Sequence, residues 1–449
     1  MERLFGTDGI RGRANRHPMT PEVAVSVGRA VARHFMGNGG ATPFVIGRDP
    51  RRSGDMIEHA VVAGICSGGG EVRRAGILPT PGVAYLAAAE GAGAGIVISA
   101  SHNPYVDNGI KLFDGRGFKL TDADEDRIEA LARDPELPGW CEGVAPGRAG
   151  ALTDASDQYV RFLINTVADG MDLTGMRIIL DASNGATFEV APRVFAELGA
   201  SVEALSVSPD GENINDGCGS EHPEALMARV VRTGATVGLA FDGDGDRLIA
   251  VDERGRRVTG DQILAVCAQA ARNRGRLPAD TVVSTVMSNI GLGLCLKSMG
   301  IRHRMADVGD RYVMAEMLAT GAVIGGEDSG HTIFLDHHTT GDGILTALKL
   351  IAAMKDSGRP LSELAGQVTV YPQVLMNVPV TRKLPISEIP GVPAAIADAE
   401  ARLGEAGRVL VRYSGTQLLC RVMVEGPTRE LTDRCCREIV DVIRSAVGQ

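Results

Sequence analysis

Residues 177–205 read RIILDASNGATFEVAPRVFAELGASVEAL and contain the pattern that decides the fold. The apolar run at its start predicts a strand, a polar turn follows at Asn184, and the segment up to Leu198 predicts a helix. Gly199 ends that helix, because glycine adopts a left-handed conformation without a steric penalty. The last five residues predict a second strand. Strand, turn, helix and strand in this order predict a βαβ unit.

The same unit occurs twice more, from residue 43 to about 74 and from residue 281 to 305. Three copies predict an α/β protein with three related mixed α/β domains. After about residue 370 the pattern changes, and two strand-like segments with a long helical one predict a smaller α+β domain. Residues 135–150, rich in Gly and Pro, predict a linker or a surface excursion. We therefore predict domains at residues 1–152, 153–254, 255–368 and 369–449.

The composition is typical of a globular protein in a reducing compartment. A length of 449 residues corresponds to about three domains of roughly 150 residues each. The net charge of −10 and the aromatic content of 4% weigh against nucleic-acid binding. No apolar stretch approaches the roughly 18 residues of a membrane span, and the amino terminus lacks the pattern of a signal peptide. The eight cysteines lack metal-binding spacing, so we expect small core residues in a cytoplasmic protein.

Three aspartates at alternating positions, Asp242, Asp244 and Asp246, predict a site for a hard cation. Their oxygens suit Mg²⁺ or Ca²⁺, and three like charges this close repel each other unless something compensates them. An EF-hand loop would place Glu253 at its twelfth position, but Arg247 stands at the sixth, where that loop needs glycine. The flanking segments are strand-like, which favours a strand–loop–strand Mg²⁺ site. Arg247 adds a planar guanidinium that suits a phosphate oxygen.

The segment GIVISASHNP, which ends at Pro104, predicts a buried strand followed by a polar loop. Proline prevents a helix from starting at once, because it lacks an N–H and restricts the residue before it. The loop displays Ser101 and His102 beyond the end of a strand, where open α/β sheets place their chemistry. Asp49, which follows Arg48 at the end of an earlier strand, is expected to support the active-site loops by orienting an arginine.

Six motifs occur in order along almost the whole chain, and together they resemble those of the α-D-phosphohexomutase family. Six ordered matches are far more specific than any one of them. The motifs occupy residues 4–12, 99–104, 242–247, 308–313, 326–331 and 412–416. The resemblance implies three α/β domains and a smaller C-terminal α+β domain around a central active-site cleft.

The resemblance also implies that Ser101 carries a phosphate. That phosphate and the three aspartates would together ligate one Mg²⁺ per subunit. Lys111 matches the family's proposed general base, His331 is a secondary acid–base candidate, and Arg11 and His102 are further catalytic candidates. To act as a base, Lys111 needs a lowered pKa, which nearby cations would provide.

The remaining motifs imply contacts with the substrate. Glu327 and Ser329 stand two apart in one loop and would hydrogen-bond adjacent sugar hydroxyls. Asp328 stands where related mutases often carry Gln; alternation would point its side chain away from these two, and the alternative is a contact with the cationic 2-amino group of the sugar. The loop after residue 411 would hold the phosphate that is not transferred, although Gln417 and Leu418 replace the family's usual Glu and Pro. The candidate substrate-binding residues are Arg247, Glu327, Ser329, Arg412, Ser414, Gly415, Thr416 and Arg421.

The implied reaction interconverts a hexose 6-phosphate and a hexose 1-phosphate through a bisphosphorylated sugar, in the supply of amino-sugar and cell-wall precursors. The forms of the first and fourth motifs favour glucosamine phosphate over mannose or glucose phosphate. Ser101 would first be phosphorylated by a hexose 1,6-bisphosphate activator, by a kinase or by itself, in a monomer or homodimer. Two other classes remain: a phosphatase with Ser101 or Asp242 as nucleophile, and a non-catalytic sugar-phosphate sensor.

Overall fold

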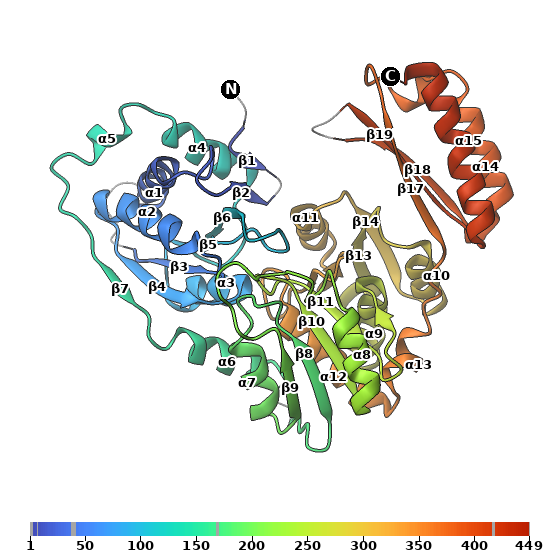
Figure 1. The fold of residues 1–449 in the computed structure, drawn as a ribbon, viewed down its shortest axis with the longest axis horizontal. Coiled ribbons are helices and arrows are strands. Elements are labelled where there is room, and N and C mark those ends of the chain that lie inside the picture. Colours follow the sequence, from blue (N-terminus) through green and yellow to red (C-terminus); the bar gives the residue numbers. More distant parts are fainter. Residues whose placement is uncertain (1–2, 7, 37–41, 168–169, 415–417, 449) are drawn as a thin grey trace. The chain divides into compact units, whose positions relative to one another are not determined.

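The computed structural model describes residues 3–6, 8–36, 42–167, 170–414 and 418–448 (Figure 1). Its contacts divide the chain into two compact units, which are described separately. The first is Met1–Val286 with Arg304–Ala365, and the second is Met287–His303 with Gly366–Gln449. Within the described residues the strands form four sheets, as the predicted four-part α/β architecture requires.

A seven-stranded mixed sheet with the order β1-β2-β6-β5-β3-β4-β7 carries the serine loop. β3 pairs in parallel with β4 and β5, whereas β6 runs antiparallel to β5. Every residue of β5 is buried, as a continuous apolar run predicts for a strand covered on both faces. Figure 1 shows α1 and α2 on one face of this sheet and α3 on the other. The elements are β1 (Phe5–Gly6), β2 (Gly9–Arg13), α1 (Pro21–Met36), β3 (Phe44–Arg48), α2 (Gly54–Ser67), β4 (Val72–Ile77), α3 (Thr80–Ala89), β5 (Ala94–Ile98), β6 (Asp107–Asp114), α4 (Asp122–Ala132), α5 (Leu137–Trp140) and β7 (Ala149–Ala151).

A five-stranded sheet with the order β12-β11-β10-β8-β9 carries the metal loop. The βαβ unit predicted at residues 177–205 is confirmed, with both strands at the predicted residues and Gly199 at a φ of 92°. β10 and β11 form an antiparallel hairpin, and residues 242–247 connect them. The elements are α6 (Ala155–Asn165), β8 (Arg177–Asp181), α7 (Val190–Glu197), β9 (Ser201–Leu205), α8 (Glu224–Thr233), β10 (Val237–Phe241), β11 (Leu248–Val251) and β12 (Arg257–Val258).

A four-stranded sheet with the order β14-β13-β15-β16 carries the sugar-loop motif. β13 and β15 are parallel, and β15 and β16 form an antiparallel hairpin whose loop spans residues 327–331. The elements of this region are α9 (Gly260–Asn273), η1 (Pro278–Asp280), β13 (Thr281–Thr285), α10 (Ile290–Ser298), β14 (Arg302–Ala306), α11 (Asp310–Thr320), β15 (Ile324–Gly326), β16 (Thr332–Phe334), α12 (Gly343–Ser357) and α13 (Leu361–Ala365).

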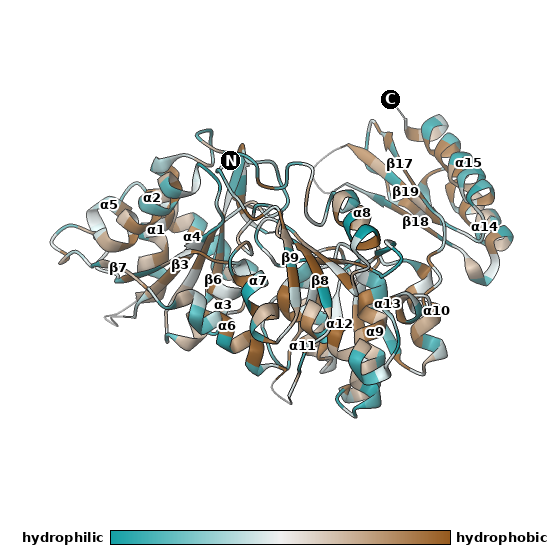
Figure 2. Ribbon diagram, turned by 60° about the horizontal axis from the view of Figure 1, so that its bottom comes forward, coloured by the Kyte–Doolittle hydropathy of each residue, from teal (hydrophilic) through white to brown (hydrophobic). Residues whose placement is uncertain are grey.

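The fourth sheet is antiparallel, with the order β17-β19-β18, and its core includes one side of the long helix α15. Figure 2 shows polar and apolar residues alternating around that helix. The adjacent Cys435 and Cys436 both belong to this core, as expected for small apolar side chains, and all eight cysteines are free thiols. The elements are β17 (Gln373–Pro379), η2 (Ile386–Glu388), α14 (Val392–Leu403), η3 (Gly404–Ala406), β18 (Arg408–Tyr413), β19 (Leu419–Glu425) and α15 (Arg429–Val447).

The Gly- and Pro-rich segment 135–150 is a surface excursion rather than a bare linker. It contains the short helix α5 and leads into β7, which pairs in parallel with β4 and extends the edge of the first sheet. Among the helices of the described ranges, none is both long enough and apolar enough to cross a membrane.

Candidate active site

Ser101 lies in the loop between β5 and β6 with its hydroxyl against the metal loop. Its Oγ donates a 2.6 Å hydrogen bond to Asp242 Oδ2, and its N–H donates to Ser99 Oγ at 2.9 Å. Its φ of 51° is unusual for a residue with a side chain, and such strain persists only where the surroundings enforce it. His102 Nδ1 lies 3.4 Å from the same hydroxyl. The structure therefore brings together the serine and metal motifs, which are far apart in the sequence.

The conformation of the serine loop is held by Arg51, which sequence reasoning missed. This side chain is fully buried, and its guanidinium donates to the carbonyl oxygens of Ser101 and Asn103, both at 2.8 Å. It also donates to the carbonyl oxygens of residues 104 and 107 and, through Nε, to Asp49 Oδ2 at 2.8 Å. Asp49 thus orients an arginine, as expected, whereas Arg48 pairs with carboxylates of α2. Burial raises the pKa of Asp49, and the Arg51 charge opposes that rise.

The three aspartates predicted to bind a metal do converge. One oxygen from each of Asp242, Asp244 and Asp246 lies within 4.8 Å of the others, and all three side chains are buried. Asp244 Oδ1 and Asp246 Oδ1 have no hydrogen-bond partner among the described residues, although Arg247 Nε lies 3.8 Å from Asp246 Oδ1, so both oxygens can ligate a cation. Burial raises the pKa of Asp242, and the charges of Asp246 and Asp244 raise it further. A buried, oxygen-only cluster with unpartnered oxygens fits a hard divalent cation.

Two features fix the shape of the metal loop. A Cβ at Gly243 would lie 2.6 Å from the Ser101 carbonyl oxygen, so only glycine lets the two loops approach this closely. Thr80, the first residue of α3, donates its hydroxyl to Asp244 Oδ2 at 2.7 Å, and its N–H donates to the Asp244 carbonyl at 2.9 Å. No sequence motif marks Thr80, because its role depends on a contact with Asp244, which lies 164 positions away in the chain.

Lys111 on β6 points into the same cluster. Its Nζ lies 2.8 Å from Asp244 Oδ2, 3.1 Å from Asp8 Oδ2 and 3.5 Å from Asp246 Oδ2. Burial lowers the pKa of this ammonium, but the three carboxylates outweigh that effect and raise it. The prediction that nearby cations lower the pKa of Lys111 is therefore wrong: its nearest charged neighbours are carboxylates. The sequence did not reveal that Asp8 and Asp244 face Lys111.

A second ammonium and a histidine extend the network. Lys119 Nζ forms ion pairs with Asp8 and Asp310, and sequence reasoning missed it because no motif contains it. His331 Nδ1 lies 3.6 Å from Asp246 Oδ2 and its Nε2 lies 3.6 Å from Asp310 Oδ2. Burial lowers the pKa of His331, whereas the two aspartates raise it and prevail. A cavity of about 500 Å³ opens beside this network, lined in part by Lys119 and Asp310.

Two arginines complete the polar surroundings of the aspartates. Arg11 forms an ion pair with Asp8 and donates to the Ala100 carbonyl oxygen at 3.3 Å, next to Ser101. The backbone N–H of Arg247 donates to Asp242 Oδ1 at 3.2 Å, and its guanidinium Nε, which has no hydrogen-bond partner among the described residues, lies 3.8 Å from Asp246 Oδ1. Both guanidinium groups therefore lie in reach of the loops that carry the serine and the metal ligands.

The predicted sugar-binding loop follows β15. Glu327 Oε1 accepts from the Gly309 N–H at 3.1 Å, and Ser329 Oγ is a buried hydroxyl without a partner among the described residues. Asp328 Oδ1 accepts from the Asp261 N–H at 3.3 Å. Asp328 therefore contacts the backbone at the start of α9.

The predicted phosphate loop belongs to the second unit. Arg412 on β18 lies directly opposite Arg421 on β19, a pairing of like charges that costs free energy unless an anion offsets it. Ser414 is buried, and its carbonyl oxygen accepts from Lys383 Nζ at 2.6 Å, a cation that sequence reasoning missed. Arg421 Nε has no hydrogen-bond partner among the described residues. The predicted residues Gly415 and Thr416, and the departure at Gln417, lie outside the described residues.

Comparisons with known proteins agree with this geometry. Four phosphoglucomutase/phosphomannomutase domain models match the chain in order: domain I at residues 2–137, domain II at 157–255, domain III at 259–371 and the C-terminal domain at 375–442. Relatives named phosphoglucosamine mutase are 54% identical in Syntrophobacter fumaroxidans and 53% identical in Syntrophus aciditrophicus, each match covering 100% of both chains.

Solved structures show the same fold. A phosphoglucomutase/phosphomannomutase family protein from Burkholderia thailandensis has a TM-score of 0.80 at 25% identity, over 99% of this chain and 97% of that one. The N-acetylphosphoglucosamine mutase of Aspergillus fumigatus, solved with GlcNAc-6P and magnesium, has a TM-score of 0.72 at 16% identity, over 99% and 96%. With domain models matched from residue 2 to residue 442, the chain belongs to the phosphoglucomutase/phosphomannomutase family of phosphohexomutases.

Proposed function

We propose that the protein is a phosphoglucosamine mutase, an isomerase that interconverts glucosamine 6-phosphate and glucosamine 1-phosphate. Relatives of that name match the whole chain at 54% and 53% identity. The observation that carries the chemistry is the 2.6 Å hydrogen bond from the buried Ser101 hydroxyl to Asp242 in the metal cluster. A phosphate on this hydroxyl would lie next to the cation site, as phosphoryl transfer requires.

The donor set favours Mg²⁺ as the metal. Asp242, Asp244 and Asp246 would hold it together with the phosphate of Ser101, because all their ligand atoms are hard oxygens. When bound, the ion supplies charge stabilisation to the phosphoryl group. Hexose 1,6-bisphosphate is the activator, and Ser101 is first phosphorylated by it, by a kinase or by the protein itself.

The reaction then has two half-steps. Ser101 gives its phosphoryl group to the free hydroxyl of the sugar phosphate, and the Oγ–P bond breaks as the sugar O–P bond forms. The bisphosphorylated sugar turns around, and its other phosphoryl group returns to Ser101 Oγ. Lys111 accepts the proton of the attacking hydroxyl, which requires that it enter the step as a neutral amine. Its carboxylate neighbours oppose that form, so before the sugar attacks the Lys111 proton must pass to one of them, for which Asp8 Oδ2 at 3.1 Å is the neighbour outside the metal ligands.

The remaining residues position the substrate. Arg11 and Arg247 hold oxygens of the transferring phosphoryl group, and Glu327 and Ser329 bind sugar hydroxyls, with the unpartnered Ser329 Oγ free to donate. His331 and His102 assist proton movement near Ser101. The phosphate that is not transferred is bound by Arg412, Ser414, Gly415, Thr416 and Arg421.

The test is conversion of glucosamine 6-phosphate by purified protein with Mg²⁺ and a trace of hexose 1,6-bisphosphate, followed by phosphorus NMR. We expect glucosamine 1-phosphate from the wild type and none from Ser101→Ala, while Ser67→Ala, a serine on α2, leaves the rate unchanged. Steady release of inorganic phosphate would make the protein a phosphatase. Faster turnover of mannose or glucose phosphate would assign it to the phosphomannomutase/phosphoglucomutase branch.

A further inference from the structure

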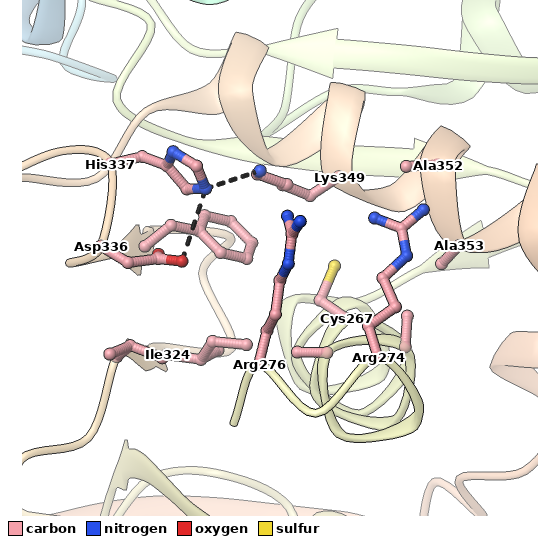
Figure 3. Close-up of a pocket in the computed structure, with 13 residues that line it drawn as sticks. Cys267, Arg274, Arg276, Ile324, Asp336, His337, Lys349, Ala352 and Ala353 are labelled. Atoms are coloured by element: carbon pink, nitrogen blue, oxygen red, sulfur yellow. Dashed lines mark hydrogen bonds and ion pairs between the residues drawn. The ribbon is translucent and has the colours of Figure 1, made fainter. Parts of the chain in front are cut away.

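Polar side chains outside the six motifs form contacts in several parts of the first unit, and some of these contacts stay local. Figure 3 shows one such group in a pocket of about 50 Å³, where His337 lies between Lys349 and Asp336. This group follows β16, at the end of the β15–β16 hairpin that is opposite to the predicted sugar-binding loop. Asn215 differs from these residues, because its side chain reaches the serine loop.

Asn215 lies in the connection between β9 and α8, which none of the six motifs covers. Its Nδ2 donates to the carbonyl oxygen of Ser101 at 2.9 Å and to that of Asn103 at 3.1 Å. Arg51 donates to the same two oxygens, both at 2.8 Å. A carbonyl oxygen has two lone pairs, so both acceptors are fully used. The serine loop is therefore held from two directions, by an arginine that follows β3 and by an amide that follows β9.

The backbone of Asn215 is fixed as well as its side chain. Its φ is 60°, a conformation that asparagine adopts more readily than most residues, and its N–H donates to the Ser183 carbonyl oxygen at 2.9 Å. A Cβ at Gly243 would lie 2.8 Å from Asn215 Nδ2, so the amide also lies against the metal loop. Asn215 thus connects the end of β8 with both active-site loops.

The contact bears directly on the strained conformation of Ser101. That residue has a φ of 51°, which persists only where the surroundings enforce it. Asn215 and Arg51 hold its carbonyl oxygen, so the peptide group after Ser101 cannot rotate toward a relaxed conformation without losing both contacts. The same conformation directs the Ser101 hydroxyl to Asp242 Oδ2. The Asn215 amide therefore contributes to the alignment of the hydroxyl with the metal ligands.

We propose that Asn215 is a positioning residue for phosphoryl transfer. Its amide holds the Ser101 carbonyl oxygen, so that the hydroxyl and the phosphate on it stay aligned with the metal cluster. This inference rests on the mutase function proposed above. Because Asn215 acts through the backbone of Ser101, its loss changes kcat and leaves KM for glucosamine 6-phosphate little changed.

Two substitutions separate the amide from the turn that it stands in. Asn215→Gly removes the amide and suits the positive φ, whereas Asn215→Asp keeps the size but turns the donor into a carboxylate that two carbonyl oxygens repel. We expect kcat to fall on the order of 10²-fold in both variants, at least as far in Asn215→Asp as in Asn215→Gly. A residue that served only to form the turn would tolerate both changes.

Asn213 provides the matched control. Its amide donates to the Ser208 carbonyl oxygen at 3.0 Å, within the same connection between β9 and α8. Asn213→Gly and Asn213→Asp therefore make the same chemical changes two residues away from Asn215. Both should keep kcat near that of the wild type, and circular dichroism verifies that all four variants are folded.

Hydrogen exchange provides a second readout that needs no substrate. The Ser101 N–H donates to Ser99 Oγ, and the Asn103 N–H donates to the Ala100 carbonyl oxygen. Mass spectrometry of the peptide that spans residues 99–106, in the full-length protein, should show exchange about tenfold faster in both Asn215 variants and unchanged in both Asn213 variants.

The two readouts distinguish the proposal from the function on which it rests. A wild type without mutase activity would refute the proposed function, and the exchange rates alone would then decide whether Asn215 holds the loop. Wild-type kcat in either Asn215 variant, slower turnover without faster exchange, or equal effects at positions 213 and 215 would overturn the proposal.

Discussion

Ser101 Oγ donates a 2.6 Å hydrogen bond to Asp242 Oδ2, although 141 positions separate the two residues. The contact joins a loop of the first sheet to a loop of the second, so that the serine and the metal ligands form one site. Gly243 allows it, because any larger residue would collide with the Ser101 carbonyl oxygen.

Arg51→Lys should reduce turnover and also lower stability, because several buried carbonyl oxygens lose their donor. Lysine keeps the charge beside Asp49 but cannot reach four loop carbonyl oxygens at once, so the Ser101 hydroxyl would move. Misplacement by about 1 Å costs on the order of 10²-fold in rate. We expect kcat to fall by that factor, with KM for glucosamine 6-phosphate little changed, in steady-state assays. Arg52→Lys, a change at the neighbouring exposed arginine, should be neutral; equal effects of both changes would contradict the assignment to Arg51.

Gly243→Ala should uncouple the two loops. The added Cβ would lie 2.6 Å from a backbone oxygen, which cannot move without moving Ser101. Overpacking of this kind costs about 1–3 kcal/mol. Urea unfolding should show that loss together with nearly abolished mutase activity. Gly139→Ala, where the added carbon meets nothing within 4 Å, is the control and should leave activity intact.

Lys111→Met should tighten Mg²⁺ binding while abolishing turnover. The Lys111 ammonium lies 2.8 Å from Asp244 and competes with a cation for that carboxylate. Without it, we expect the Mg²⁺ Kd measured by titration calorimetry to fall about tenfold, which corresponds to ~1.4 kcal/mol. Lys119→Met removes an ammonium that pairs with Asp8 and Asp310 instead, so its effect on Mg²⁺ affinity should be small. Weaker Mg²⁺ binding by Lys111→Met would show that Lys111 supports the metal site.

His338 should make the protein less stable in mild acid. Its Nε2 lies 2.9 Å from the Pro81 carbonyl oxygen and its Nδ1 accepts from the Thr339 N–H at 2.8 Å, so the neutral ring is fully satisfied. Burial lowers its pKa to about 4. Between pH 6.5 and about 4 the unfolded chain therefore binds a proton that the folded protein does not, and stability falls as the pH falls.

The full effect of this histidine is at most about 3 kcal/mol, since one pKa unit corresponds to about 1.4 kcal/mol. Urea unfolding at pH 7 and pH 4.5 measures it. His338→Gln should lose less stability than the wild type between these two pH values, whereas His59→Gln at an exposed site should behave as the wild type. Parallel pH profiles for wild type and His338→Gln would rule out this source of acid sensitivity.

The sequence revealed those parts of the fold and site that depend on local patterns. The strands at residues 177–181 and 201–205 follow from an apolar run and a glycine stop, and the aspartate cluster follows from alternating carboxylates. The sequence did not predict a role for Arg51, Thr80 or Lys119, because no local pattern near them indicates one. Each acts through contacts with distant residues, such as the 111 positions between Lys119 and Asp8. The charge state of Lys111 was misjudged for the same reason.

The buried guanidinium of Arg51 has an evolutionary consequence. It holds the loop after β5 by carbonyl oxygens, which every amino acid carries, and not by side chains. The backbone path of the serine loop is thus set in part by a residue 50 positions away, and not only by the side chains of the loop itself. Selection on the position of the nucleophile therefore acts on Arg51 as well as on the loop, although Arg51 lies outside every motif that carries the family resemblance.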